Sequence, residues 1–291
     1  MKKAFLQLHL SVFIAGFTGI LGKLITLNEI LLVAYRILIT ILILGALLHY
    51  KKMLKRLPLK EIIRISLVGF LICFHWVAFY GSIKYSNVSV ALVCFSATGF
   101  FTSLFEPLIL KRRIDLGELF LGLLTIVGIY IIFDFYPQYL LGIIFGVAAS
   151  IGSSIFPIFN KQLLEKYSPR EVTFYELTGG LILLLAFIPF YLTKFPANYY
   201  LPTMSDWGWL LLMATGGTVL MFELQLHALR KISAFTVNLT YNLEPVYGII
   251  LAFIIFKENK SLGPGFYFGL SLIFLAIVLQ TFRVKHQSKG S

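Results

Sequence analysis

Long apolar runs, separated by short polar segments, dominate this chain. The hydrocarbon core of a bilayer is about 30 Å thick, so a helix that rises 1.5 Å per residue needs about 20 apolar residues to cross it. We therefore expect an all-α membrane protein with about ten transmembrane helices. The expected spans cover residues 5–23, 30–50, 65–83, 88–110, 116–133, 140–160, 172–193, 207–229, 228–258 and 266–282.

The ninth of these runs, 228–258, carries several polar residues at membrane depth, where they are costly unless they face protein or water. At 100° per residue, Asn238, Tyr241 and Asn242 share one helix face with Pro245, and Glu244 lies about 120° away. Pro245 leaves the carbonyl of Tyr241 without its helical donor. This face is a candidate patch for a substrate amine or hydroxyl. The alternative is that its amides bond to neighbouring helices and the proline only kinks the span.

Composition and charge fit a membrane protein. The chain is 58% hydrophobic and 13% charged, against about 45–50% and about 25% in ordinary soluble domains. Its formal net charge of +12 does not indicate nucleic-acid binding, because the basic residues lie between the apolar runs. The expected partners are the lipid bilayer and a small-molecule substrate, with protons as a candidate coupling ion.

The distribution of basic residues predicts the orientation. With a cytoplasmic N-terminus, nineteen of the 25 Lys and Arg residues fall in inside loops. The exceptions are Lys23, Lys84, Lys194, Lys257 and Lys260 at the outer ends and Arg36 within a span. This asymmetry predicts that both termini are cytoplasmic. The N-terminal segment has no A-x-A-type cleavage site, so we interpret it as the first span rather than as a signal peptide.

The two halves of the chain resemble each other. Residues 81–101 are similar to residues 228–248, and a charged cluster and a glycine-containing last span follow each segment. This alignment brings Ser96 and Thr98 near the polar patch of the ninth span. Five spans per half place the second half upside down in the membrane, and inverted repeats of this kind are typical of transporters.

Three segments resemble the EamA-type members of the drug/metabolite transporter superfamily. They are GFTGILGKLITLNEILLVAYRILIT, HWVAFYGSIKYSNVSVALV and LRKISAFTVNLTYNLEPVYGIILAFIIFKE. The matching positions are Lys23 and Arg36, then Pro245 in mid-helix and Glu258 at the helix end. The first repeat departs from this pattern, since it has Gly99 and Arg112 where the proline and the terminal glutamate would stand.

The resemblance covers essentially the whole chain and implies two inverted five-helix repeats, residues 1–136 and 137–291, acting as one transport unit. It further implies a multi-pass protein of the bacterial cytoplasmic (inner) membrane. The implied function is export of amino acids or related small metabolites by alternating access.

Four charged residues within or beside the spans are candidates for a proton site or a charge pair. Glu244 could carry a proton or pair with Arg36 or Lys23. Arg36 and Glu176 occupy equivalent places in the two repeats, so they could pair across the pseudo-two-fold axis. The alternative is that Arg36 extends towards the outer surface.

An aromatic cluster in the third span is a second candidate binding element. His75, Trp76, Phe79 and Tyr80 lie at helical spacing and could line a cavity that receives an ammonium group. The alternative for His75 is a hydrogen-bonded core histidine.

Functions outside amino-acid and metabolite export are less well matched. The sequence has no Walker motif, dinucleotide-binding glycine motif, metal-ligand spacing or nucleophile elbow, so we expect no enzyme activity, cofactor or metal. A carrier of nucleotide sugars or phosphate esters would need converging basic groups in mid-membrane, where only Arg36 qualifies. A cationic-drug carrier and a membrane scaffold that transports nothing are two further possibilities.

Overall fold

The computed structural model describes residues 2–52, 57–229, 231, 240–241 and 243–287, and every regular element in this part of the chain is helical. The elements are α1 (Lys2–Leu24), α2 (Glu29–Tyr50), α3 (Leu59–Tyr85), α4 (Val88–Phe95), α5 (Thr98–Leu110), α6 (Leu116–Phe135), η1 (Pro137–Tyr139), α7 (Leu140–Leu164), α8 (Pro169–Lys194), α9 (Met204–Ala214), η2 (Thr215–Leu220), α10 (Met221–Leu229), α12 (Glu244–Phe256), η3 (Glu258–Lys260) and α13 (Pro264–Gln287). The predicted all-helical class is confirmed for these residues.

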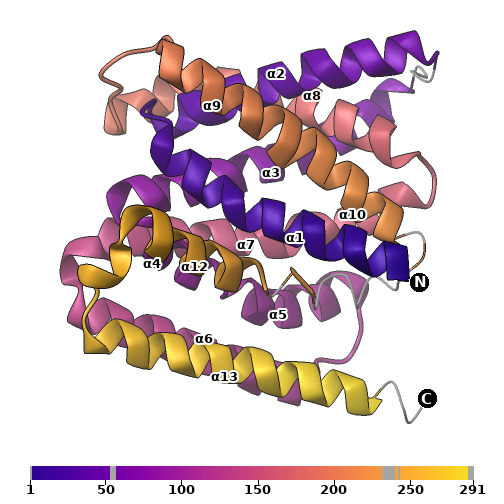
Figure 1. Cartoon of the computed structure of the whole chain (residues 1–291). Helices are drawn as coiled ribbons and strands as arrows, with labels where there is room; N and C mark the ends of the chain where they lie inside the picture. The colour runs from indigo at the N-terminus through magenta and orange to yellow at the C-terminus, as the bar shows by residue number, and fades with distance from the viewer. Residues whose placement is uncertain (1, 53–56, 230, 232–239, 242, 288–291) are drawn as a thin grey trace.

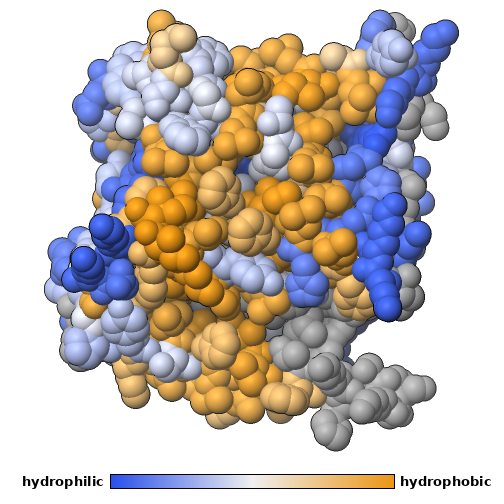
Figure 2. Space-filling model, viewed as in Figure 1, coloured by the Kyte–Doolittle hydropathy of each residue, from blue (hydrophilic) through white to orange (hydrophobic). Residues whose placement is uncertain are grey.

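The helices form a bundle with two distinct ends. The start of α1 and the end of α13 lie at the same end, and the α1–α2 and α12–α13 connections lie at the opposite end (Figure 1). We call this opposite end the Lys23 end, because Lys23 lies in the last turn of α1. Apolar side chains cover the middle of the surface in Figure 2, and polar residues gather towards both ends. A bilayer requires a surface of this kind.

Most of the predicted spans correspond to observed helices. Eight stretches of the described chain are long and apolar enough to cross a membrane. The ninth and tenth predicted spans are represented by two shorter apolar helices, Glu244–Phe256 and Pro264–Gln280. Much of the predicted ninth span lies outside the described residues, and the total of ten stays a prediction.

The two halves of the chain interlock. Helix α1 packs against α10 and α12 of the second half, and α7 packs against α3, α4 and α5 of the first half. Helix α2 packs against α8, and α6 against α13. Each half therefore contributes its first helix to the packing of the other half.

Glycines allow some of these helices to cross at backbone distance. A Cβ atom added to Gly69 of α3 would lie 1.9 Å from the carbonyl oxygen of Glu176 in α8. One added to Gly180 of α8 would lie 2.6 Å from the carbonyl oxygen of Gly69. Neither contact could be relieved by rotating a side chain, because both involve backbone atoms. The hydrophobic driving force between helices is weak in lipid. The close packing that small residues allow at such crossings stabilises the association instead.

The α3–α8 crossing leads to a stability prediction. Gly69→Ala should destabilise the protein by about 1–3 kcal/mol, because the helices must move apart to admit the methyl group. The matched control is Gly208→Ala in α9, where an added Cβ meets no atom within 4 Å. Thermal unfolding in detergent should show a lower midpoint for the first variant and an unchanged or higher one for the control. Equal midpoints for Gly69→Ala and wild type would contradict the tight crossing.

Candidate functional site

A buried arginine lies at the junction of α2, α3 and η2. The Arg36 side chain is only 2% exposed. Its Nε donates to Thr218 Oγ1 (3.0 Å), its Nη1 to the Tyr80 hydroxyl (2.6 Å) and its Nη2 to the carbonyl of Gly217 (3.1 Å). The guanidinium carbon also lies 3.8 Å from the centre of the Trp76 ring, at the distance of a cation–π contact. The charge is thus held by hydrogen bonds and an aromatic face rather than by a contacting carboxylate of the described chain.

A local change of helix type supplies two of these acceptors. Between α9 and α10 the chain forms six residues of π-helix, Thr215–Leu220, with sequence TGGTVL. Glycine, threonine and valine are weak α-helix formers, and single π-turns often occur at functional sites. The turn presents the carbonyl of Gly217 and the hydroxyl of Thr218 to Arg36. Thr218 in turn donates to the carbonyl of Met213 at 3.3 Å, so the hydroxyl is bonded on both sides.

Tyr80 and Trp76 are the two members of the predicted aromatic cluster that meet Arg36. The Tyr80 hydroxyl accepts from the guanidinium and lies 3.5 Å from Met213 Sδ. Phe79 contacts Tyr80 edge to face, with ring centroids 5.5 Å apart. The sequence therefore placed the aromatic residues correctly on α3, but it did not predict that Arg36 would be their partner.

His75 faces a different neighbour. Its Nδ1 lies 3.1 Å from the carbonyl of Ala149 on α7, and because a carbonyl can only accept, Nδ1 carries the proton. Its ring stacks on Phe95 and Phe156 at 5.2 and 5.9 Å. These contacts favour the alternative of a hydrogen-bonded core histidine between α3 and α7.

The predicted fourth span is broken in its middle. α4 ends at Phe95 and α5 begins at Thr98, with a two-residue turn between them. Ser96 donates to the carbonyl of Val93 (2.5 Å) and Thr98 to the carbonyl of Phe95 (2.7 Å). Both hydroxyls thus donate to the last turn of α4 and keep only their acceptor capacity for another group. Their predicted role in substrate binding stays a prediction.

Glu244 is the first residue of α12, and Pro245 follows it in the first turn. The Glu244 side chain is half-buried and close enough to Arg36 for electrostatic interaction. Within the described part of the chain, no ion pair of 4 Å or less joins the two groups. An isolated carboxylate at this depth is costly, so Glu244 is suited to receive a proton or a cation.

The predicted polar patch can be located only in part. The Tyr241 hydroxyl lies 3.4 Å from the Ser11 hydroxyl of α1. Asn238 and Asn242 lie outside the described residues. The expectation that this face binds substrate therefore stays a prediction.

The structure supports neither of the two alternatives for Arg36, a pair with Glu176 or extension to the outer surface. Arg36 binds Thr218, Tyr80 and Gly217 and does not pair with Glu176. It does not extend to the outer surface either, because its side chain is enclosed. The Glu176 side chain is buried in α8, where its Oε1 has no hydrogen-bond partner among the described residues. Arg36 does not need Glu176 as a partner, because the π-turn supplies its guanidinium with neutral acceptors.

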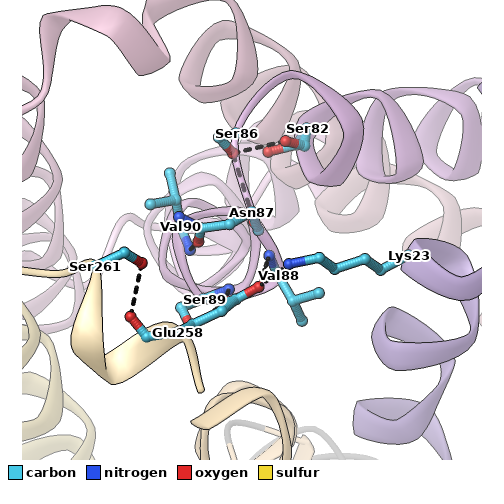
Figure 3. Close-up of polar contacts among 9 residues, drawn as sticks. All are labelled: Lys23, Ser82, Ser86, Asn87, Val88, Ser89, Val90, Glu258 and Ser261. Carbon is cyan, nitrogen blue, oxygen red and sulfur yellow. Dashed lines mark hydrogen bonds and ion pairs between the residues drawn. The ribbon is translucent and has the colours of Figure 1, made fainter. Parts of the chain in front are cut away.

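Lys23 pairs with Glu258 instead of the predicted Glu244. The Lys23 ammonium donates to Glu258 Oε1 at 2.7 Å (Figure 3). The same carboxylate accepts from the backbone N–H groups of Val88 (3.1 Å) and Ser89 (2.8 Å) and from the Ser89 hydroxyl (2.6 Å). Glu258 therefore joins α1, the first turn of α4 and the end of α12.

The N-terminus of α4 favours this carboxylate. Its first N–H groups have no partners inside the helix and its dipole attracts negative charge. Asn87 caps the helix by accepting from the N–H of Val90, so Glu258 satisfies the donors that the cap leaves free. Burial alone would raise the pKa of Glu258, but the hydrogen bonds from Lys23 and Ser89 outweigh burial and lower that pKa.

Further bonds join the two halves at the Lys23 end. Asp206, at the start of α9, accepts from the N–H of Thr26 at 2.7 Å. The Asn28 side chain donates to the carbonyl of Phe195 at 3.2 Å. Together with the Lys23–Glu258 pair, these contacts hold the two halves together at this end.

Several residues of this network were not predicted. The acceptors Gly217 and Thr218 could have been suspected from the weak helix formers of TGGTVL. Ser89 could have been suspected from Asn87, whose position before an apolar run is typical of a helix cap. The contact between Ser89 and Glu258 spans 169 residues, and no local sequence pattern predicts such a contact.

Comparison with known proteins places this chain in a family. The EamA-like transporter family matches it twice, over residues 2–134 and 140–282. YetK, an uncharacterized transporter of Bacillus subtilis (strain 168), is 26% identical over 267 residues, which are 88% of this chain and 80% of that protein. An uncharacterized transporter of Archaeoglobus fulgidus is 23% identical over 154 residues, 53% of each protein.

The fold also matches a solved structure. A crystal structure described only as that of a protein superposes with a TM-score of 0.66 at 14% identity, covering 97% of this chain and 98% of the other. At this identity the match concerns the fold alone. The two family matches cover nearly the whole chain, and the helices are those of a multi-pass membrane protein. The chain belongs to the EamA-like transporter family.

Proposed function

We propose that the protein is a secondary transporter that exports amino acids or related small metabolites from the bacterial cytoplasm across the inner membrane. The observation that carries this proposal is the buried guanidinium of Arg36 with the carboxylate of Glu244 nearby but not in contact. A zwitterion presents an anion and a cation, and Arg36 and Glu244 carry the two opposite signs.

Arg36 retains donors for an anionic ligand. A guanidinium has five N–H groups, and Thr218, Tyr80 and Gly217 occupy three of them. The other two N–H groups have no acceptor among the described residues, and two is the number that a carboxylate accepts in a bidentate contact. The ammonium of the same substrate would then be directed to Glu244. A carrier of phosphate esters would need several basic groups here, and Arg36 stands alone among the described interior residues.

The architecture supports alternating access between two inverted five-helix repeats, residues 1–136 and 137–291. The family matches once in each of these segments. The exchange of α1 and α7 between the halves is the packing expected of such repeats. The common location of α1's start and α13's end supports termini on one side of the membrane, which the distribution of basic residues predicts to be the cytoplasm (Figure 1).

Interrupted helices support a binding site between the repeats. α12 starts at Glu244 within the apolar part of the bundle, and α4 and α5 meet at a short turn whose Ser96 and Ala97 N–H groups stay bonded to α4. Discontinuous helices of this kind form the substrate sites of many secondary transporters, because their free backbone groups can bind ligands and ions.

The central prediction is that purified protein in liposomes carries radiolabelled amino acids across the membrane. Arg36→Lys should reduce this flux at least about tenfold, because an ammonium cannot bond to three neighbours in the fork geometry of a guanidinium. Lys260→Met, at an exposed lysine of η3, serves as the control and should transport like wild type. Absence of flux for a panel of amino acids and related metabolites, with and without a pH gradient, would contradict the proposal and favour a scaffold.

A second prediction concerns proton coupling. If Glu244 carries the proton, Glu244→Gln should abolish counterflow driven by a pH gradient and leave substrate exchange in place, since the amide cannot ionise. Both rates are measured in the same liposomes, with a gradient imposed for the first and preloaded substrate for the second. Counterflow at the wild-type rate in Glu244→Gln would exclude this residue as the carrier.

A third prediction concerns the closed Lys23 end. Glu258→Gln should increase labelling of Cys94 by a membrane-impermeant thiol reagent in a Cys73→Ala background, because the bonds from Lys23, Val88 and Ser89 weaken together. Lys23→Met should have a smaller effect, since the α4 donors still hold the carboxylate. Lys260→Met is again the control. Labelling at the wild-type level in Glu258→Gln would show that this contact does not keep the end closed.

The same contact has a defined pH dependence. Because the pKa of Glu258 is lowered in the folded protein, its ionised carboxylate stabilises the end contact in full above the ordinary glutamate pKa of about 4.3. This stabilisation is lost only as the pH falls through the lowered pKa. Cys94 labelling should therefore stay constant between about pH 5 and 7 in wild type, apart from the reagent's own pH dependence, which free cysteine controls for.

A further inference from the structure

A polar hollow lies at the Lys23 end, apart from Arg36. Its volume is about 150 Å³, whereas a cavity for one water needs about 10–15 Å³ by the same measure. Three parts of the chain line it: the α1–α2 turn, residues 26–29; the end of α3, at Lys84 and Tyr85; and residues 196–199 before α9. The hollow is thus large enough for a small organic molecule.

Glu29, one of the residues that line this hollow, is buried. Glu29 begins α2 and is 1% exposed. Its Oε1 accepts from the hydroxyls of Tyr191 (2.6 Å) and Tyr85 (3.4 Å). Its Oε2 accepts no hydrogen bond from the described residues. Half of the hydrogen-bonding capacity of a buried anion is therefore available to a donor in the hollow.

A lysine of opposite charge lines the same hollow. Lys84 Nζ donates to the carbonyl of Ile25 at 2.9 Å, and an ammonium has two further N–H groups to donate. Lys84 interacts electrostatically with Glu29 and Asp206, but among the residues described no ion pair within 4 Å joins it to either. Asp206 is already bonded to Thr26 and Thr203. Glu29 and Lys84 are thus two opposite charges that share one hollow without neutralising each other.

We propose that this hollow binds a small zwitterion, with its ammonium at Glu29 and its carboxylate or phosphate at Lys84. The hydroxyls and rings of Tyr85 and Tyr199 offer a polar and apolar wall for the rest of the molecule. Two sources share this chemistry: a free amino acid and the headgroup of phosphatidylethanolamine. The inference does not depend on the central site, because none of its residues bonds to Arg36.

The experiment measures binding to the purified full-length protein in detergent by isothermal titration calorimetry. The probes are a panel of free amino acids and, for each, the matching amino-acid amide and N-acetyl amino acid, which each retain one charge. A parallel measurement places the protein in nanodiscs containing either phosphatidylethanolamine or phosphatidylglycerol and detects retained lipid by native mass spectrometry.

Lys84→Met and Glu29→Gln should each weaken binding about tenfold or more, because each removes one charge-assisted contact. Glu29→Gln keeps an acceptor for Tyr191, so it tests the charge without emptying the cavity. Lys260→Met, an exposed lysine outside the hollow, should bind like wild type. Affinities are compared only between variants whose thermal unfolding midpoints equal that of wild type. Lys84→Arg should bind more tightly than Lys84→Met, because it keeps the positive charge.

The outcomes separate the two sources. Calorimetric binding of amino acids that both single-charge analogues lose, and that Lys84→Met weakens, identifies the free molecule as the occupant. Retention of phosphatidylethanolamine by wild type but not by Lys84→Met identifies the headgroup. Binding of neither, or equal binding of either by wild type and both charge variants, overturns the proposal. Arg36→Lys should leave unchanged the component of binding that Lys84→Met weakens, so a loss of transport in that variant does not bear on the hollow.

Discussion

The guanidinium of Arg36 imposes the strongest constraint on this fold, because it places a full charge inside a bundle whose surroundings are apolar. The effective cost of burying an unpaired ion is several kcal/mol. The structure meets that cost with a hydroxyl from α3, a hydroxyl and a carbonyl from η2 and the face of Trp76. Three elements from both halves of the chain must therefore keep their relative positions as long as the arginine stays enclosed.

One irregular part of the backbone, the π-turn η2, contacts this arginine directly. In a regular α-helix the internal carbonyls already accept a backbone hydrogen bond, so they are less available to a neighbouring arginine. The π-turn of η2 provides one, at the carbonyl of Gly217. α12 also starts inside the bundle, at Glu244, and α4 and α5 meet there at a short turn. Such irregular backbone is tolerated at this depth only where protein or an internal cavity surrounds it.

Much of the fold could be predicted from the sequence, because a span is a local property of about 20 residues. The apolar runs indicated the helices and their order, and Pro245 marked one interruption. The break at Ser96 was missed, because the apolar residues around it continue the run without a proline. The partners of Arg36 and Lys23 were also missed. Each pairing joins residues far apart in the chain, and a charge in the sequence specifies only that some partner must exist.

The central charges and the Glu258 contact place different demands on the transport cycle. A contact that holds one end closed must stabilise the closed state of the bundle. Its free energy must still be small enough for substrate binding to offset it. A ligand shifts such an equilibrium only by the difference in its affinity for the two states. Glu258 has several partners but lies beside a partly exposed lysine, where an ion pair contributes modestly. Arg36 is fully enclosed and needs its neutral partners at all times. In the proposed alternating-access cycle, the end contact is therefore the element expected to open, and the arginine is the fixed point around which the helices would move.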